Sequence, residues 1–111
     1  MQIFYAMGAS KLLMFVVTSK FTVANGMAAE VRQAFLQRPH LVDGAPGFVR
    51  IEVWNAHEQR DEFFLVTYWA DEGSFQHWHR NHRHASHAGI PKGLKLVPGS
   101  AQVRFFDQFC D

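Results

Sequence analysis

The chain has 111 residues, of which 48% are hydrophobic and 14% aromatic. A disordered chain would be poor in hydrophobic residues and high in net charge, so this composition predicts one globular domain. Eleven basic and ten acidic residues give a formal net charge of +1, which excludes the strong positive field of a typical nucleic-acid-binding protein.

The N-terminal 13 residues contain an apolar run that Lys11 interrupts and that no basic residue precedes. A secretory signal begins with basic residues, and a membrane-spanning helix needs about 20 apolar residues. We therefore expect neither a signal peptide nor a membrane partner. The sequence predicts an N-terminal extension over residues 1–13 and a single domain over residues 14–111.

The first predicted strand lies within residues 14–23, where apolar and polar residues largely alternate from Val17 onward. This alternation is typical of a half-buried strand and places Ser19 and Phe21 on its inward side. Asn25 is then expected to cap a helix that ends near Pro39. The apolar stripe of this helix follows helical spacing and consists of Met27, Val31, Ala34, Phe35 and Leu41.

Two further strands are predicted on either side of a polar hairpin at residues 55–60. The first covers residues 48–54 and follows a turn rich in Gly and Pro, with Val49, Ile51 and Val53 as its apolar face. The second covers residues 62–69 and is expected to pair with it in antiparallel orientation.

A second helix is expected from about Asp71 to Gly89, followed by a loop and a last strand over residues 102–109. The order β-α-β-β-α-β predicts an α+β, ferredoxin-like fold, in which one antiparallel sheet carries two helices on one face. Phe and Trp on both faces of the strands lead us to expect a homodimer formed through the sheets.

Cys110 is the single cysteine, so the chain forms no intramolecular disulfide. Nothing in the cysteine usage indicates an oxidising compartment, and a cytoplasmic location is expected.

Five of the seven histidines lie in residues 69–89. At about 100° per residue, Phe75, Trp78, His79 and His82 fall on one side of a helix and His77, His84 and His87 on the other. The simplest interpretation is that the two aromatic residues anchor the helix while most histidines face solvent. A zinc site is a second interpretation, although the His-Glu-x-x-His pattern of catalytic zinc helices is absent.

A third interpretation rests on His87, which lies at the end of the helix. A neutral imidazole that faces an apolar cavity lined by Trp69 and Phe21 suits haem iron as an axial ligand. In this interpretation one histidine of the segment, His87, has a function, which is to bind the haem iron.

Several short motifs carry a resemblance to a known family: Phe21-Thr-Val-Ala-Asn-Gly, Pro46-Gly47-Phe48, Thr67-Tyr68-Trp69, Phe75-Gln-His-Trp78 and Ala85-Ser-His87-Ala88. Over residues 14–109 the chain resembles the antibiotic biosynthesis monooxygenase (ABM) superfamily, and within it the IsdG-type haem-degrading monooxygenases. The resemblance implies oxidative ring opening of haem with O2 and an external electron donor.

The resemblance also implies three functional positions: an asparagine on the first strand, a tryptophan at the end of the third and a histidine at the end of the second helix. Trp69 and His87 match the second and third, as the residue that distorts the macrocycle and the iron ligand, with Phe21 beside them in the pocket. The first position falls on Ser19, whose hydroxyl reaches less far than an amide. Slower or altered turnover, or haem binding without much degradation, is therefore expected.

Two alternative functions are compatible with the same residues. In a cofactor-independent ABM oxygenase, Ser19, Trp69 and His87 would position and deprotonate a polycyclic phenol or quinol. A non-enzymatic dimeric binding module is the second alternative, because a fold by itself does not fix a function.

Overall fold

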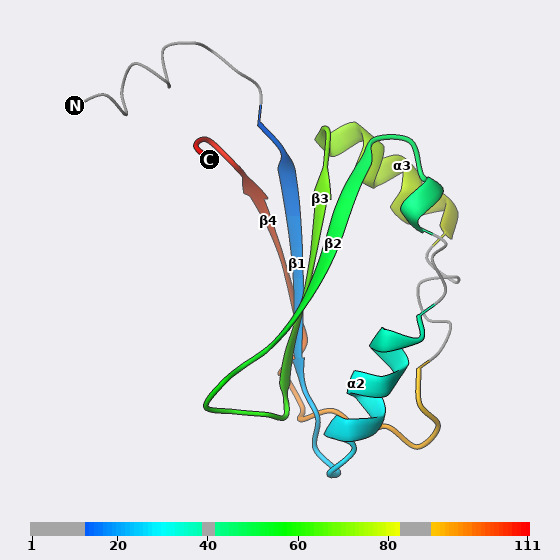
Figure 1. The fold of residues 1–111 in the computed structure, drawn as a ribbon, viewed down its shortest axis with the longest axis vertical. Helices are drawn as coiled ribbons and strands as arrows, with labels where there is room; N and C mark the ends of the chain where they lie inside the picture. Colours follow the sequence, from blue (N-terminus) through cyan, green and yellow to red (C-terminus); the bar gives the residue numbers. More distant parts are fainter. Residues whose placement is uncertain (1–12, 39–41, 83–89) are drawn as a thin grey trace, which may run out of the picture.

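In the computed structural model of the chain, residues 13–38, 42–82 and 90–111 are described (Figure 1). They form four strands and two helices in the order β-α-β-β-α-β, which confirms the predicted ferredoxin-like fold. The elements are β1 (Phe15–Thr22), α2 (Ala28–Leu36), β2 (Phe48–Asn55), β3 (Glu62–Trp69), α3 (Glu72–His82) and β4 (Gln102–Asp107), with a short 3₁₀ turn, η1 (Val42–Gly44), before β2.

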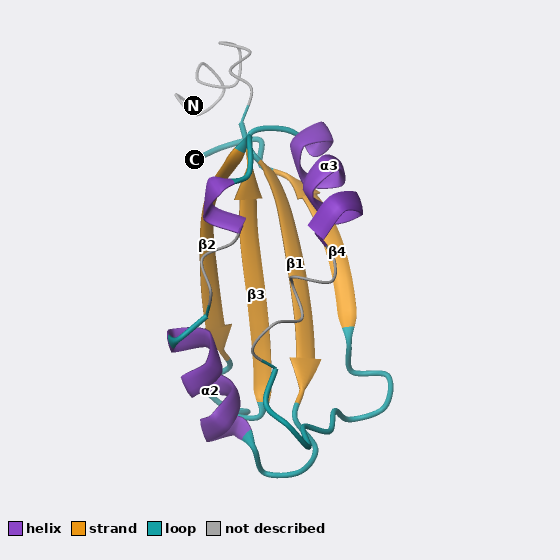
Figure 2. Ribbon diagram, turned by 90° about the vertical axis from the view of Figure 1, so that its right-hand side faces the viewer, coloured by secondary structure: helices purple, strands orange, loops and turns teal. Residues whose placement is uncertain are grey.

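The strands form one antiparallel sheet in the order β2-β3-β1-β4. The register places Phe15 opposite Trp69 and Phe21 opposite Phe63. Both helices cover the same face of the sheet, with α2 at one end of the strands and α3 at the other (Figures 1 and 2). We call the opposite face, which neither helix covers, the open face.

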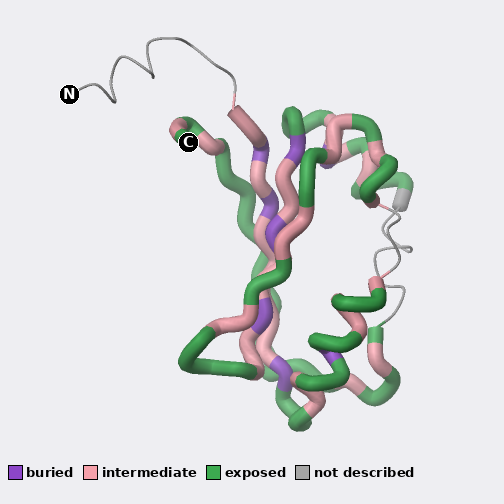
Figure 3. The backbone as a smooth tube through the Cα atoms, viewed as in Figure 1, coloured by how far each residue is buried: buried purple, intermediate pink, exposed green. Residues whose placement is uncertain are grey.

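Each helix packs on its own hydrophobic cluster (Figure 3). Under α3 the buried residues are Phe15, Val17, Trp69 and Phe75. Under α2 they are Val23, Val31 and Phe63. Each such side chain contributes roughly 1.5–3 kcal/mol by leaving water, so the two ends of the sheet hold most of the core energy.

A β-bulge changes the face of β2 that the alternation predicts. The pairing with β3 shifts between Phe48 and Arg50, so Val49 has no partner of its own and is 46% exposed. Phe48, Ile51 and Val53 therefore share the helix-covered face, and the predicted place of Val49 on that face was wrong. Strict alternation assumes one residue opposite one, whereas a bulge sets two residues against one.

Two predicted boundaries also differ. Met27, not Asn25, is the N-cap of α2, and it makes no side-chain capping bond. The Asn25 side chain instead donates to the Gly93 carbonyl oxygen at 2.8 Å and accepts from the Lys95 amide at 3.4 Å, so it joins two loops. The last strand ends at Asp107, because its partner β1 begins opposite it at Phe15.

Leu41, which was expected in the apolar stripe of the first helix, lies outside the described residues. In the part of the chain that the structure describes, neither helix has the length and apolar character needed to cross a membrane.

Candidate functional site

Between the two helices the covered side of the sheet presents an apolar surface around Ser19. Ser19 lies opposite Leu65 of β3 and Val103 of β4, and Val53 of β2 continues the row. Val53 is 37% and Val103 is 55% exposed, so this surface is open where the helix clusters end. We call these four residues the central apolar face.

The Ser19 hydroxyl is the polar group in this row. Ser19 is half-buried, and its side chain makes no hydrogen bond to any residue that the structure describes. A hydroxyl donor in apolar surroundings is therefore available to a ligand that lies on the central apolar face.

Trp69 lies in the core under α3 and is 0% exposed. Its indole Nε1 donates to the Thr67 Oγ1 at 2.9 Å, and its ring contacts those of Phe48 and Phe75 edge-on at 5.4 and 5.6 Å. An indole that is fully packed and hydrogen-bonded cannot touch a ligand without rearrangement of the core.

Trp78 on α3 is the tryptophan that keeps exposed surface in this cluster. Its ring is tilted by 39° against that of Trp69, with the centroids 5.8 Å apart, and it packs on the cluster while remaining only half-buried. The sequence analysis used Trp78 as a helix anchor alone. Trp78 follows the buried Phe75 by three residues, which places it at the border of the packed face of the helix. This spacing could have indicated that part of its ring stays accessible.

Phe21 and Trp69, which were expected to line one cavity, belong to different clusters of the described residues. Phe21 stacks on Phe63 at 5.6 Å and belongs to the cluster under α2. Phe63 and Trp69 are six residues apart on β3, or about 20 Å at the rise of a strand. Ser19 falls between them along the sheet, opposite Leu65.

His87 and His84 lie outside the described residues, so the structure gives no position for the proposed iron ligand. Two other histidines of the segment are on α3 and exposed, as the simplest interpretation expects. His79 stacks on Phe75 at 5.4 Å, and the His77 carbonyl oxygen accepts from Asn81 at 2.8 Å. Residues 13–38, 42–82 and 90–111 contain no group of three His, Cys, Asp or Glu suited to a metal ion.

The Pro-Gly-Phe motif positions α3. Gly47 has a φ of 81°, and a Cβ there would collide with the Ser74 side chain in the first turn of α3. The Gly47 carbonyl oxygen accepts from the Ala70 amide at 2.7 Å. Hydrogen bonds from the Ser74 backbone amide, at 2.7 Å, and from its hydroxyl lower the pKa of Asp71, which caps the helix as a carboxylate.

The open face carries a polar network among aromatic residues. The Tyr68 hydroxyl donates to a Glu52 carboxylate oxygen at 2.9 Å, and the Arg50 guanidinium lies 3.7 Å from the centroid of the Tyr68 ring. Burial and the hydrogen bond to Glu52 raise the pKa of Tyr68. Trp54 is 50% and Phe106 is 38% exposed on the same face.

Comparisons with known proteins place these features in a family. Residues 14–88 match the family described as antibiotic biosynthesis monooxygenase. The chain is 31% identical over 83 residues to a mycobilin-producing heme oxygenase of Mycobacterium tuberculosis, which covers 75% of this chain and 78% of that protein. It is 35% identical over 68 residues to a staphylobilin-producing heme oxygenase of Staphylococcus haemolyticus, which covers 59% and 64%.

Solved structures share the fold. The heme degrader MhuD of Mycobacterium tuberculosis, with two hemes bound in its active site, superposes with a TM-score of 0.72 at 26% identity over 87% of this chain and 97% of that one. SnoaB, a cofactor-independent oxygenase of Streptomyces nogalater, superposes with a TM-score of 0.66 at 20% identity over 86% and 93%, a likeness of fold alone. Because the family match spans residues 14–88, more than half of the sequence, the chain belongs to the antibiotic biosynthesis monooxygenase family.

Proposed function

We propose that this protein is a monooxygenase that binds haem and degrades it with O2 and electrons from an external donor. The observation that carries the proposal is the 31% identity, over 83 residues, to a mycobilin-producing heme oxygenase. The cofactor-independent alternative has no comparable support, because the likeness to SnoaB at 20% identity concerns the fold.

The residues of the central apolar face fit a flat apolar ligand. Val53 and Val103 expose apolar surface on the outer strands, and Phe105, which shares this face on β4, is 54% exposed. Covering such surface stabilises a complex by about 25 cal/mol per Å². Haem itself supplies the iron and the conjugated ring for the reaction with O2, while the chain binds it, orients it and excludes water.

Four residues have distinct roles in this proposal. The Ser19 hydroxyl donates a hydrogen bond to the ligand at the middle of the sheet, where apolar neighbours strengthen it. Trp78 forms a wall of the pocket, and the buried Trp69 holds the Trp78 ring in place from behind. His87, in a segment that the structure does not describe, is the proposed axial ligand of the iron.

We also infer a homodimer formed through the open face and a cytoplasmic location. A face that carries half-exposed Trp54 and Phe106 gains by being covered. With a single cysteine the chain has no need of an oxidising compartment for a disulfide within itself.

A haemin titration of the apo-protein, followed at the Soret band, tests the proposed function. The wild type should give a shifted and sharpened Soret band, and His87→Ala should change both its position and the affinity. His77→Ala, an exposed histidine of α3, is the matched control and should leave both unchanged. Identical spectra and affinities for His87→Ala and the wild type would show that His87 is not the ligand.

A further inference from the structure

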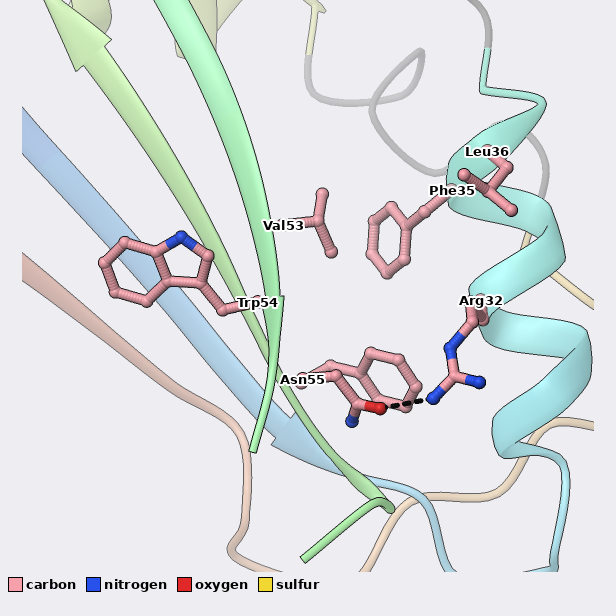
Figure 4. A pocket seen from close by; sticks show the side chains of 7 residues that line it. Arg32, Phe35, Leu36, Val53, Trp54 and Asn55 are labelled. Carbon is pink, nitrogen blue, oxygen red and sulfur yellow. Dashed lines mark hydrogen bonds between the residues drawn. The ribbon is translucent and has the colours of Figure 1, made fainter. Parts of the chain in front are cut away.

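The central apolar face ends differently at its two ends. At the α2 end it borders a groove of about 300 Å³ between α2 and β2, in which the Val53 side chain points toward Phe35 (Figure 4). At the α3 end, Thr67 follows Leu65 on the same face of β3, and Trp69 follows Thr67. A ligand on the central apolar face therefore has room toward α2 and meets the packed residues of the α3 cluster at the other end.

The Thr67 hydroxyl lies between the strand backbone and the Trp69 indole. Thr67 is half-buried and pairs with Val17 of β1 on one side and Ile51 of β2 on the other. Its Oγ1 accepts from the Trp69 Nε1 at 2.9 Å and donates to the Val17 carbonyl oxygen at 3.5 Å. Because a hydroxyl has a single proton, the bond to Val17 directs that proton away from the indole and turns a lone pair toward Trp69.

This hydrogen bond sets the orientation of the Trp69 indole. The ring is 0% exposed, and its edge-on contacts with Phe48 and Phe75 are apolar, so they do not fix where Nε1 lies. The Nε1 proton is the one polar donor of the side chain, and buried donors in folded proteins are nearly always paired. Without the Thr67 hydroxyl, the indole would have to turn to reach another acceptor.

The orientation of Trp69 in turn affects Trp78. The two ring centroids are 5.8 Å apart and the planes are tilted by 39°. Trp78 is half-buried, so part of its ring rests on the α3 cluster while the rest keeps exposed surface. Since packed interiors leave few voids, a turned Trp69 ring would remove part of the surface on which Trp78 rests.

We propose that Thr67 is a positioning residue of the haem site, which holds the Trp78 wall in place through the Trp69 indole. The inference rests on the proposed function, in which Trp78 forms a wall of the pocket, and deepens it. A side chain that is already held in its bound position loses less freedom when the ligand arrives. Thr67 therefore raises the affinity for haem by preorganising Trp78.

The test compares Thr67→Val, which replaces the hydroxyl by a methyl group, with Thr67→Ser, which keeps the hydroxyl. In the apo-protein, the Nε1 proton signal of Trp69, assigned by its loss in Trp69→Phe, should shift and exchange faster with solvent in Thr67→Val. Haemin should bind about two- to tenfold more weakly to Thr67→Val, the cost of ordering one large side chain on binding. Thr67→Ser should keep the wild-type proton signal and affinity.

The Trp78→Ala background separates this positioning role from a general structural one. If Thr67 acts through Trp78, Thr67→Val should weaken haemin binding no further in Trp78→Ala, whereas independent effects would multiply. Thr18→Val is the matched control, because it makes the same change on the open face of β1, opposite Val66, and it should bind haemin like the wild type. Thermal melts establish that each variant is folded. If Thr67→Val does not fold, Thr67→Cys, whose sulfur is a weak acceptor, takes its place.

Three results would overturn the positioning role and leave the proposed function intact. They are wild-type haemin affinity in Thr67→Val, a loss in Thr67→Ser as large as that in Thr67→Val, and a full further loss when Thr67→Val is added to Trp78→Ala. A wild type that binds no haemin would overturn the proposed function and the role of Thr67 together.

Discussion

The ring centroids of Trp69 and Trp78 are 5.8 Å apart, but the two side chains differ in their exposure to solvent. Trp69 is 0% exposed and its Nε1 is bonded to Thr67, so its surface is fully used by the core. Trp78 packs on the same cluster and remains half-buried. Trp69 therefore contributes to the stability of the core, whereas the proposed role of Trp78 is contact with the ligand.

This division predicts opposite effects for the two alanine variants. Trp69→Ala should lower the free energy of unfolding by about 3–5 kcal/mol, the usual cost of emptying an aromatic core site. Trp78→Ala should lower it less and should weaken haemin binding in the folded protein. Denaturant melts and Soret titrations measure the two effects, and unchanged haemin affinity in Trp78→Ala would refute its place in the pocket wall.

At the scale of elements, the loop before β2 sets the place of α3 through Gly47. Its φ of 81° is unfavourable for any other residue, and its close approach to Ser74 leaves no room for a Cβ. Phe75 and Trp78 lie on α3. The contact between Gly47 and Ser74 therefore positions the residues that α3 contributes to the candidate site.

Gly47→Ala should therefore destabilise the fold by more than the roughly 1–2 kcal/mol that a left-handed alanine costs. Gly99→Ala is the matched control, since Gly99 has a φ of 76° but no atom near the position of a Cβ. Combining Gly47→Ala with Ser74→Gly removes the steric clash, so it should recover the free energy of unfolding that Gly47→Ala loses beyond the loss in Gly99→Ala. Equal free energies of unfolding for Gly47→Ala and Gly99→Ala would contradict the steric account.

The sequence allowed prediction of those elements whose pattern is local. A high content of aromatic and β-branched residues predicted the bounds of β3 correctly, and its pairing with β1 is regular over the whole strand. The bulge at Val49 depends on the partner strand, and the role of Asn25 depends on a loop that is 68 residues away. Neither has a signature in its own neighbourhood.

The candidate site could be predicted only in part for the same reason. Ser19 was placed correctly on the covered face of the first strand, since alternation reports the face directly. Helical periodicity shows Trp78 only as an anchor on the packed face of the helix, and it does not tell that the Trp78 ring keeps exposed surface. Which tryptophan is buried also depended on tertiary packing.

In the described part of the molecule, both helices lie on one face of the sheet and no helix covers the open face (Figures 1 and 2). Trp54 and Phe106 expose large apolar surfaces on it, and the network of Arg50, Glu52 and Tyr68 lies among them. A second copy of the chain, which brings the same mixture, would cover the apolar groups and leave polar groups to pair.

Trp54→Glu should shift the protein from dimer to monomer, because it places a charge on the open face, where the second copy would pack. Sedimentation velocity over a range of concentrations measures the change. Leu96→Glu introduces the same charge at a 39% exposed residue that is bridged to Val23 beyond the end of β1, and it should leave the dimer intact. A wild type that sediments as a monomer at all concentrations would refute the dimer.

Tyr68 predicts a loss of stability at alkaline pH. Burial and the hydrogen bond to Glu52 raise its pKa above the ordinary value of 10.0, so the folded state holds this proton more tightly than the unfolded state. The contribution of Tyr68 to the free energy of unfolding is complete below the ordinary pKa, and it is lost as the pH rises through the raised pKa of the folded state. Between about pH 9 and 11 the wild type should lose more unfolding free energy than Tyr68→Phe, and parallel curves would contradict this.

The most direct measurement of the central claim is turnover of bound haem with ascorbate as electron donor, in air and with catalase present. The account predicts that the Soret band of the haem complex decays and that iron becomes available to a ferrous chelator. Both changes should be faster for the haem complex than for free haemin under the same conditions. A Soret band that forms on binding and then persists unchanged under ascorbate would contradict haem degradation.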